Sequence, residues 1–357
     1  MILTVNCGSS SVRLDAFAGD PPARVASGRS EGSDARAPLP AFLARCGQPV
    51  EVVAHRIVHG GELSETTRID DATERAIEAL SSLAPLHNAP ALAGIRAARE
   101  RLPDAAHFAV FDTAFFARLP VASRTYALPL DLARAHGLRR YGFHGLAHRA
   151  MWERWAALRP EHARAGRAIT FQLGAGCSAA AIRGGAPLDT SMGFTPLEGL
   201  VMATRPGDVD AGLLTHLQRV ARLDAAALDR LLYTSSGLAG LAGESSVSRL
   251  LARDDAEARL AVEVYCHRAR RYLGAFLAVL GGADAVVFGG GVGENVPAIR
   301  QRILAGMEWA GIELDPGANS APGTDGRIGA SDSGADLRVV AVDEAALLAA
   351  EARAAMS

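Results

Sequence analysis

The sequence predicts an α/β fold in two domains, and three observations support this. The chain has 357 residues, more than a single hydrophobic core usually serves. Short apolar stretches alternate with amphipathic ones, as in folds where helices connect strands. A strand–turn–strand pattern around Gly8 recurs around Gly176, 168 residues later. We therefore expect two related domains, each beginning with a β-hairpin.

Local patterns predict the individual elements. The Pro-, Gly- and Ala-rich stretch 19–50 is expected to form loops with one short helix. The Gly-rich turn at 289–294 is expected to lead into a helix, with Asn295 as its N-cap and Pro297 in its first turn. Apolar alternation predicts hairpins at 2–17 and 168–185, strands at 51–58, 107–112 and 283–288, and helices at 72–84, 91–102, 254–281 and 343–356.

Composition excludes several classes of function. The net charge is −2 and the two signs are interspersed, so no nucleic-acid or membrane partner is expected. No apolar run reaches the roughly 18–20 residues that a membrane span needs. The widely spaced Cys7, Cys46, Cys177 and Cys266 form no CxxC pair. Free thiols in a reducing, cytoplasmic compartment are therefore expected.

The chemistry is expected in polar, glycine-rich segments, because such residues can converge on a phosphate and a metal. The turn at 6–11 offers backbone N–H groups and hydroxyls to phosphate oxygens. It lacks the GK[ST] ending of a Walker A loop, and taken alone it could be a plain turn. The other segments of this kind are 54–61, 84–88, 111–115, 141–145, 192–210 and 288–295.

Two arginines and one carboxylate stand out by their context. Arg56 lies in an apolar strand and Arg205 between an apolar run and Pro-Gly-Asp, so neither occupies a solvated helix face. A guanidinium fork can hold two oxygens of a phosphoryl group. Asp112 ends an apolar strand, where a carboxylate needs a metal, a donor or an arginine nearby.

The histidines and the last glycine-rich loop allow more than one interpretation. His55/His59 and His144/His148 have the i,i+4 spacing of zinc ligands, but no Glu follows the first histidine as in HExxH, so a zinc site is a weak alternative. The loop 289–295 is typical of nucleotide binding at a helix start. It matches GxGxxG only loosely, and no acidic residue follows about 20 positions later, which makes an NAD-dependent dehydrogenase a weak alternative.

The order and spacing of these segments resemble those of the acetate kinase family, a family of acetate and propionate kinases in the actin-like ATPase superfamily. The resemblance runs from residue 1 to about residue 350. It implies a duplicated, ribonuclease H-like fold, with an N-terminal domain of 1–113 plus 343–357 and a nucleotide-binding domain of 114–342. It also implies a homodimer that uses ATP and Mg²⁺ to phosphorylate acetate, or a similar short carboxylate, reversibly to acetyl or acyl phosphate.

The same resemblance implies roles for individual residues. Catalysis is carried over to Arg56, Asp112, His144 and Arg205, and magnesium binding to Asn6 and Glu344; from sequence alone, Glu344 could equally be a plain helix-start acid. The carboxylic acid is expected to contact Arg56, Val58, Leu86, His87, Phe143 and Pro196. The nucleotide is expected to contact Arg13, Gly174, Gly176, Arg249, Gly289, Gly290, Gly291, Gly293 and Asn295.

Several positions depart from the family pattern. Gln172 and Ala175 replace the His and Asn of the usual HLGNGSS loop, and Leu146 and Ala147 replace two hydroxyl residues. The usual Asp-Phe before Arg249 is missing. Two alternatives therefore stay open beside an acetate kinase: a kinase for propionate, butyrate or another acid (or with another nucleotide), and a nucleotide-binding paralogue that does not turn over.

Overall fold

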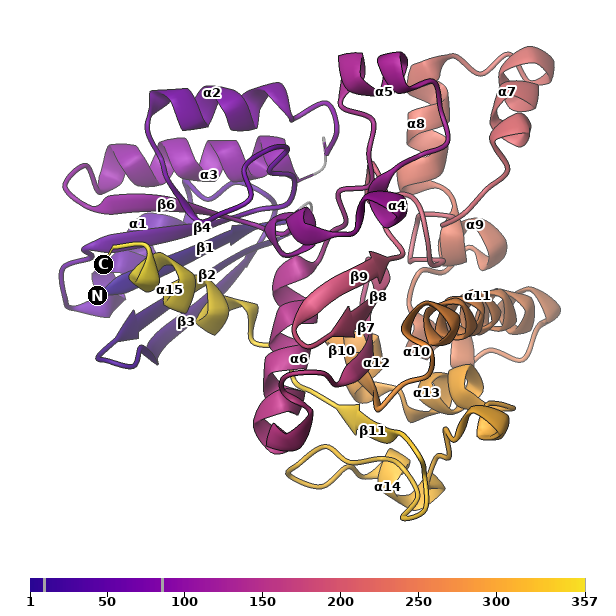
Figure 1. Ribbon diagram of the computed structural model, residues 1–357. Helices are drawn as coiled ribbons and strands as arrows, with labels where there is room; N and C mark the ends of the chain where they lie inside the picture. The colour runs from indigo at the N-terminus through magenta and orange to yellow at the C-terminus, as the bar shows by residue number, and fades with distance from the viewer. Residues whose placement is uncertain (9–10, 85–86, 357) are drawn as a thin grey trace. The chain divides into compact units, whose positions relative to one another are not determined.

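The computed structural model describes residues 1–8, 11–84 and 87–356, which pack into two compact units (Figure 1). Unit 1 comprises 1–117, 143–146 and 343–357, and unit 2 comprises 118–142 and 147–342. Unit 1 is therefore discontinuous, because the end of the chain returns to it. The predicted domains, 1–113 with 343–357 and 114–342, remain a prediction, because two compact units need not be independent domains.

Unit 1 is built on a six-stranded mixed sheet in the order β3-β2-β1-β4-β6-β5. The strands β1, β2 and β3 form an antiparallel meander, and β4 and β6 extend it in parallel with β1. The strand bounds are β1 Ile2–Cys7, β2 Ser11–Ala18, β3 Ala23–Glu31, β4 Val52–Ile57, β5 Thr67–Arg68 and β6 Ala106–Phe111.

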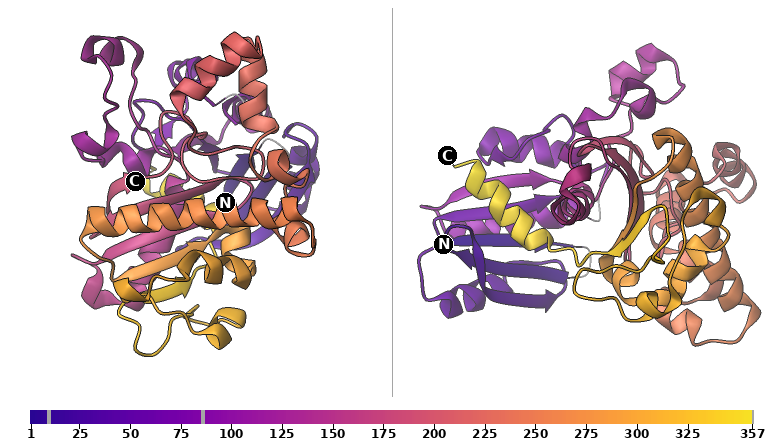
Figure 2. Two further views of the ribbon diagram at one scale, coloured as in Figure 1. Left: turned by 90° about the vertical axis from the view of Figure 1, so that its right-hand side faces the viewer. Right: turned by 60° about the horizontal axis from the view of Figure 1, so that its bottom comes forward.

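Helices cover the two faces of this sheet differently. On one face, α1 and α3 pack on apolar side chains of β1, β2 and β4 such as Leu3, Leu14 and Val53. On the other face α15 crosses the strands (Figure 2, right), burying its Leu348 against Ile2 and Val52, and Leu146 belongs to the same cluster. The helix bounds are α1 Pro38–Cys46, α2 Asp71–Ala79, α3 Asn88–Arg101 and α15 Glu344–Ala354. Much of the second face beyond α15 is left open to carry polar side chains.

Unit 2 repeats the strand order of unit 1. Its sheet runs β11-β10-β7-β8-β9, again an antiparallel meander (β7 to β9) extended by two parallel strands. The predicted repeat of a hairpin followed by related strands therefore appears in the topology, although the hairpin of unit 2 begins only at Arg167, well after the start of the unit. The strand bounds are β7 Arg167–Leu173, β8 Cys177–Arg183, β9 Ala186–Thr190, β10 Ala285–Gly289 and β11 Asp336–Val339.

The long helix α11 covers β7, β8 and β9 in unit 2 (Figure 2, left). It begins at an Asp255 N-cap and ends where Gly281 adopts a left-handed conformation, as such helices commonly do. The helices of unit 2 are α4 Val121–Arg124, α5 Leu130–His136, α6 Gly145–Leu158 (its first residues belong to unit 1), α7 Ala211–Val220, α8 Ala225–Thr234, α9 Gly237–Ala242, α10 Val247–Leu251, α11 Ala256–Leu280, α12 Gly290–Asn295, α13 Pro297–Leu304 and α14 Pro316–Ser320.

Two sequence predictions about elements are wrong. The stretch 19–50 contains the strand β3 as well as α1, and β3 escaped notice because its side chains are small or polar and mostly exposed. Asn295 does not cap the helix that begins at Pro297. Residues 290–295 are themselves helical, so Asn295 ends α12, donating from Nδ2 to the Gly291 carbonyl at 2.9 Å, and Val296 stands in the cap position.

The surface gives one finding about membranes. Among the described residues, no helix is long and apolar enough to cross a bilayer.

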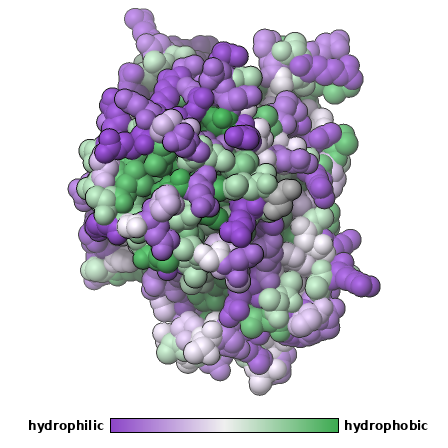
Figure 3. Space-filling view, turned by 90° about the vertical axis from the view of Figure 1, so that its left-hand side faces the viewer, coloured by the Kyte–Doolittle hydropathy of each residue, from purple (hydrophilic) through white to green (hydrophobic). Residues whose placement is uncertain are grey.

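The surface of unit 1 is mixed in polarity. On the side shown in Figure 3, polar side chains surround a smaller apolar area. The most exposed large apolar side chains of unit 1 are Val25 and Met356.

Two histidines lie side by side inside unit 1. His55 Nε2 and His107 Nδ1 are 3.1 Å apart, and His107 Nε2 lies 3.0 Å from the Leu102 carbonyl oxygen. Burial lowers the pKa of both rings, and for His55 the neighbouring His107 and Arg99 lower it further. Both rings are therefore neutral in the folded protein.

This pair predicts a loss of stability on mild acidification. Because the folded pKa values lie below the unfolded value of about 6.5, the full stabilisation is present above that pH and is lost as pH falls below it, by up to about 1.4 kcal/mol per pH unit for each ring. We expect the thermal unfolding midpoint to fall between pH 7 and pH 5. The fall should be smaller in His55→Asn and unaltered in His216→Gln, a change at an exposed histidine. An identical pH dependence in all three proteins would contradict this account.

Candidate functional site

An ion triad stands on the open face of the unit 1 sheet. Arg56, at the end of β4, binds Asp112 through two parallel contacts, Nε–Oδ1 at 3.0 Å and Nη2–Oδ2 at 2.7 Å. Its third nitrogen, Nη1, lies 2.9 Å from Oε2 of Glu344, the first residue of α15. Asp112 follows β6, which is hydrogen-bonded to β4. The topology thus brings three residues from distant parts of the chain to one point.

The charges of the triad depend on one another. Burial opposes the charged form of Arg56, but Asp112 and Glu344 outweigh it and raise the pKa of the guanidinium. Burial also raises the pKa of Glu344; Arg56 opposes this rise and Asp112 adds to it. Asp112 is fully buried, whereas 15% of the Arg56 side chain and 20% of the Glu344 side chain are exposed. The exposed edges of these two groups are available to a ligand.

A glycine fixes the position of His144 next to this triad. Gly145 N donates to the Asp112 carbonyl at 3.0 Å, and a Cβ at Gly145 would lie only 2.1 Å from that oxygen. The close approach therefore requires glycine. His144 has φ +57°, a left-handed conformation that costs a non-glycine residue free energy. The strained histidine is thus held at the start of α6, one residue from the Asp112 contact.

A second group of predicted residues gathers around Asn88, which sequence reasoning missed. Its side chain accepts from His59 N at 3.0 Å and donates to His59 O at 2.9 Å. The His59 ring meets the buried Phe143 ring edge-on, with centroids 5.4 Å apart. Val58 is half-buried. Unit 1 therefore brings together an apolar group and histidines near the end of β4.

Two predicted residues of the acid pocket need separate mention. His87 is half-buried and immediately precedes α3, whose first residue is Asn88. Leu86, predicted for the same pocket, lies outside the described residues. Pro196 belongs to unit 2.

Arg205 in unit 2 is a cation without a carboxylate partner among the described residues. Its Nη1 donates to the Pro196 carbonyl at 2.7 Å, and burial lowers the pKa of its guanidinium. Arg205 is half-buried, and a partly desolvated cation whose charge is not neutralised favours an anionic ligand. This is the strongest sign in unit 2 that an anion belongs beside the predicted residues.

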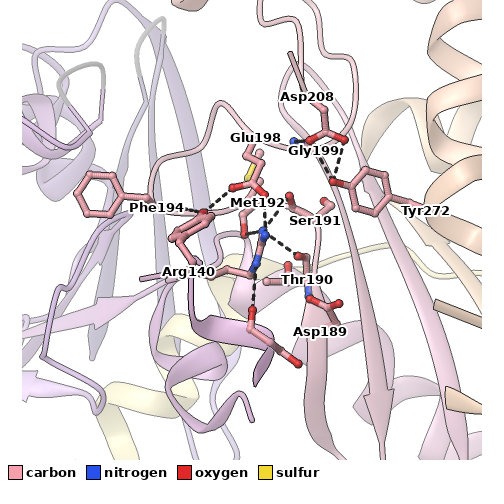
Figure 4. Close-up of polar contacts among 12 residues, drawn as sticks. Arg140, Asp189, Thr190, Ser191, Met192, Phe194, Glu198, Gly199, Asp208 and Tyr272 are labelled. Carbon is pink, nitrogen blue, oxygen red and sulfur yellow. Dashed lines mark hydrogen bonds and ion pairs between the residues drawn. The ribbon is translucent and has the colours of Figure 1, made fainter. Parts of the chain in front are cut away.

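Arg140, a residue that sequence reasoning missed, holds the segment that carries Pro196 (Figure 4). Its Nη1 reaches the carbonyls of Thr190 and Met192 at 3.3 and 3.1 Å, and its Nη2 lies 2.5 Å from Oε1 of Glu198. The Tyr126 hydroxyl donates to the same carboxylate and accepts from Phe194 N. In the sequence Arg140 is followed by Tyr-Gly, and nothing in this local pattern indicates that it makes so many contacts.

Asp208 closes the other end of the same segment. Its Oδ1 accepts from Gly199 N at 2.8 Å, and its carboxylate accepts from the Tyr272 hydroxyl at 3.1 Å (Figure 4). The chain between residues 190 and 208 is thus fastened at both ends. Because Arg205 lies inside it, the Arg140 and Asp208 contacts hold that guanidinium in place.

The two predicted nucleotide loops lie side by side in unit 2. The strands β7 and β10 are parallel neighbours, so the turn after β7, with Gly174 and Gly176, adjoins the glycines after β10. Gly290 has φ +77°, and a Cβ there would lie 2.6 Å from the Leu173 carbonyl. Gly289 ends β10, while Gly291 and Gly293 lie in α12. Phosphates bind preferentially at such carboxyl ends of parallel strands.

Two further residues bear on nucleotide binding: Gln172, which departs from the usual family loop, and Arg249, a predicted nucleotide contact. Gln172 Oε1 is buried and has no hydrogen-bond partner among the described residues. Arg249, in α10, makes two hydrogen bonds to the Glu244 carboxylate, at 2.5 and 2.8 Å, and its side chain is mostly exposed. Hydrogen bonding to Arg249 lowers the pKa of Glu244 to about 2. Arg249 would have to leave this partner to contact a nucleotide.

Comparison with known proteins decides the family. The profile of the Acetokinase family matches residues 43–350. The chain belongs to this family. It is 47% identical over 314 residues to the acetate kinase of Clavibacter sepedonicus, covering 87% of this chain and 79% of that protein. It is 43% identical over 311 residues to that of Chloroherpeton thalassium, covering 85% and 75%.

Solved structures agree with the family and the predicted fold. The acetate kinase of Porphyromonas gingivalis superposes with a TM-score of 0.90 at 33% identity, covering 100% of this chain and 99% of that one. A propionate kinase from Francisella tularensis superposes with 0.92 at 32% identity, covering 99% of both chains. The prediction of a two-domain actin-like ATPase fold is confirmed. As a member of the acetokinase family, the chain is a phosphotransferase with a carboxyl group as acceptor.

The Arg140 contacts predict a large effect from a residue outside the predicted site. Arg140→Gln leaves Glu198 without its cation, which typically costs about 3 kcal/mol or more and should lower the unfolding midpoint by roughly 6–12 °C. Adding Glu198→Gln should recover part of the loss, because the uncompensated carboxylate is then removed. Arg259→Gln, at an exposed pair with Asp254, should shift the midpoint by less than about 2 °C. Equal shifts in Arg140→Gln and Arg259→Gln would refute this assignment.

Proposed function

We propose that this acetokinase family member is an acetate kinase, transferring the γ-phosphoryl group of ATP to acetate and releasing ADP and acetyl phosphate, reversibly. One carboxylate oxygen attacks the γ-phosphorus, and the bond to the β–γ bridging oxygen breaks, so ADP leaves with that electron pair. Acetate is already ionised at neutral pH, so no base is needed to activate it. The observation that carries the proposal is Arg205, a half-buried cation without a carboxylate partner among the described residues.

The catalytic roles follow from charge and placement. The transferred phosphoryl group spreads negative charge over three oxygens, and preorganised guanidinium groups stabilise it best. We assign this role to Arg205 and to the exposed edge of Arg56, whose Nε and Nη2 bind Asp112 and whose Nη1 binds Glu344. His144, fixed in a left-handed conformation, supplies a further donor to the same oxygens. Asp112 keeps Arg56 charged and in a single orientation.

Acceptor size is assigned to the apolar residues near the end of β4. Phe143 is fully buried and Val58 half-buried, and with Leu86, His87 and Pro196 they are proposed to contact the short alkyl group of the acid. Each additional methylene changes discrimination by only ~1–3 kcal/mol in such pockets. Propionate is the second candidate acceptor, since the superposition on a propionate kinase has a TM-score of 0.92.

The residues proposed for magnesium fit that ion. Asn6 Nδ2 donates to Glu344 Oε2 at 3.5 Å, so the Asn6 amide and the Glu344 carboxylate are neighbours. Mg²⁺ usually takes one or two carboxylates and completes its shell with substrate phosphates and water. When bound, Mg²⁺ would neutralise phosphate charge. Glu344 would then be held in its ionised form, against the effect of its burial.

The nucleotide is assigned to the loops after β7 and β10. Gly174, Gly176 and the glycines 289–291 and 293 are proposed to line the site of its phosphates, with Asn295, Arg249 and Arg13 as side-chain contacts. Gly174 N donates to the Gly176 carbonyl and Gly290 N to Glu294 Oε1, each at 3.0 Å, so these two N–H groups would have to exchange partners to bind phosphate. Ala175 cannot supply the side-chain amide of the usual family loop, and the unpartnered Oε1 of Gln172 can only accept. From the family we also carry over a homodimer that acts in the cytoplasm. Light scattering after gel filtration would test whether the protein is a dimer.

Trapping of acyl phosphate with hydroxylamine tests the reaction. With Mg-ATP and a series of acids from formate to butyrate, we expect product mainly with acetate, and less with propionate. Arg205→Ala should lower the rate at least about 100-fold, because it removes a preorganised transition-state donor. Arg219→Ala, at an exposed position on α7, should leave the rate within twofold. ATP binding without product from any acid would refute the proposal and favour a nucleotide-binding protein without turnover.

A further inference from the structure

A row of polar side chains crosses four strands on the open face of unit 1. Arg29 in β3 pairs with Arg13 in β2, and Arg13 pairs with Asn6 in β1. His55 pairs with Val5, so Arg56, the next residue, comes level with Asn6. Residues paired across neighbouring strands project from the same face. The row therefore reads Arg29, Arg13, Asn6, Arg56.

This row lines a cavity of about 510 Å³ within unit 1. Its charged lining among the described residues consists of Arg13, Arg29 and Arg56, and the hydroxyls of Ser11 and Ser27 face the same space. The lining contains no carboxylate among these residues. The Ser27 hydroxyl donates to Asp15, so the groups that suit this cavity to an anion are the three guanidinium groups and the Ser11 hydroxyl.

Arg29 is the member of the row that no known role explains. Like charges directly opposite each other on paired strands destabilise a sheet, and Arg13 and Arg29 stand in that relation. Asp15, two residues along β2 from Arg13, already receives Arg13, Arg24 and Ser27. Glu31, two residues from Arg29 on the same face of β3, makes no ion pair with it among the described residues. Arg29 makes no hydrogen bond or ion pair within the described residues, so the protein itself does not neutralise this second arginine.

We propose that Arg29 and Arg13 form a phosphate-binding subsite, separate from the position that Arg56 serves. Strands lie about 4.8 Å apart, so Arg29 stands roughly 14 Å from Arg56, measured across three strand intervals. A single phosphate group does not span that distance, whereas Arg13 and Arg29, one interval apart, can hold one between them. The ligand is a phosphate group, either free or at the end of a phosphorylated substrate; its place in catalysis rests on the proposed function.

Calorimetric titration of the full chain with inorganic phosphate, without nucleotide, tests the subsite. Arg29→Gln should weaken phosphate binding at least about fivefold, and Arg29→Lys less, because lysine keeps the charge without the fork. Arg75→Gln, at an exposed arginine on α2, should bind as the wild type does. Because Arg29 is exposed, both variants should fold. Equal phosphate affinity in Arg29→Gln and wild type, or no phosphate binding by the wild type, would overturn the proposal.

Kinetics of the same variants identify the source of the phosphate. If it belongs to the nucleotide, Arg29→Gln raises the KM for ATP more than it lowers kcat. If it is free phosphate, the variant loses inhibition by added phosphate and keeps its KM for ATP. Acyl phosphate formation by the wild type is measured alongside. Phosphate binding that depends on Arg29 in a chain that makes no acyl phosphate would refute the proposed function and leave the subsite standing.

Discussion

The contact on which the rest of the site depends is the bidentate ion pair between Arg56 and Asp112. Asp112 is fully buried, and an uncompensated charge there would cost several kcal/mol. The pair satisfies both groups and fixes the guanidinium plane at the ends of two parallel strands. Glu344 then binds the remaining nitrogen and attaches the start of the last helix to the same point. One arginine thus joins β4, β6 and α15.

The C-terminal helix α15 packs on unit 1, and this explains how one face of the unit 1 sheet can be apolar at one end and polar at the other. The helix α15 covers the rows of Ile2, Val52 and Phe17, and burial of these side chains stabilises it there. On β2, Asp15 lies two residues before Phe17 on the same face. Arg13, which belongs to the arginine row, lies two residues before Asp15. Apolar packing at one end of the strands therefore positions the charged groups at the other, with Glu344 at the boundary.

The sequence predicted much of the fold because its signals are local. Gly/Ser turns between apolar strands identified both hairpins, and apolar periodicity identified α3 and α11 closely. The strand β3 was missed because its alternating side chains are Ser, Arg, Ala and Gly, and its backbone is stabilised by pairing with β2. Asn295 was assigned wrongly because its own segment is helical. Packing of α12 against β7 and β10 stabilises that helix.

The predicted site followed from residues whose own neighbours are unusual, such as an arginine inside an apolar strand. Arg140, Asn88 and Arg29 lack that context: their importance comes from groups 29 to 58 positions away or from a cross-strand partner. Arg140 binds a segment that begins 50 residues later. Only the folded topology brings such partners together. The individual site roles, including those of Asp112 and His144, stay proposals until tested.

The most direct test of the account is a double-mutant cycle on kcat/KM for phosphoryl transfer, with Arg56→Gln, Asp112→Asn and both together. If Asp112 acts only by holding Arg56, each single change removes the same unit, and the double variant should be about as slow as Arg56→Gln alone. Thermal unfolding of each variant would establish that it is folded. Losses that simply multiply in the double variant would contradict the claim that these two residues act as one.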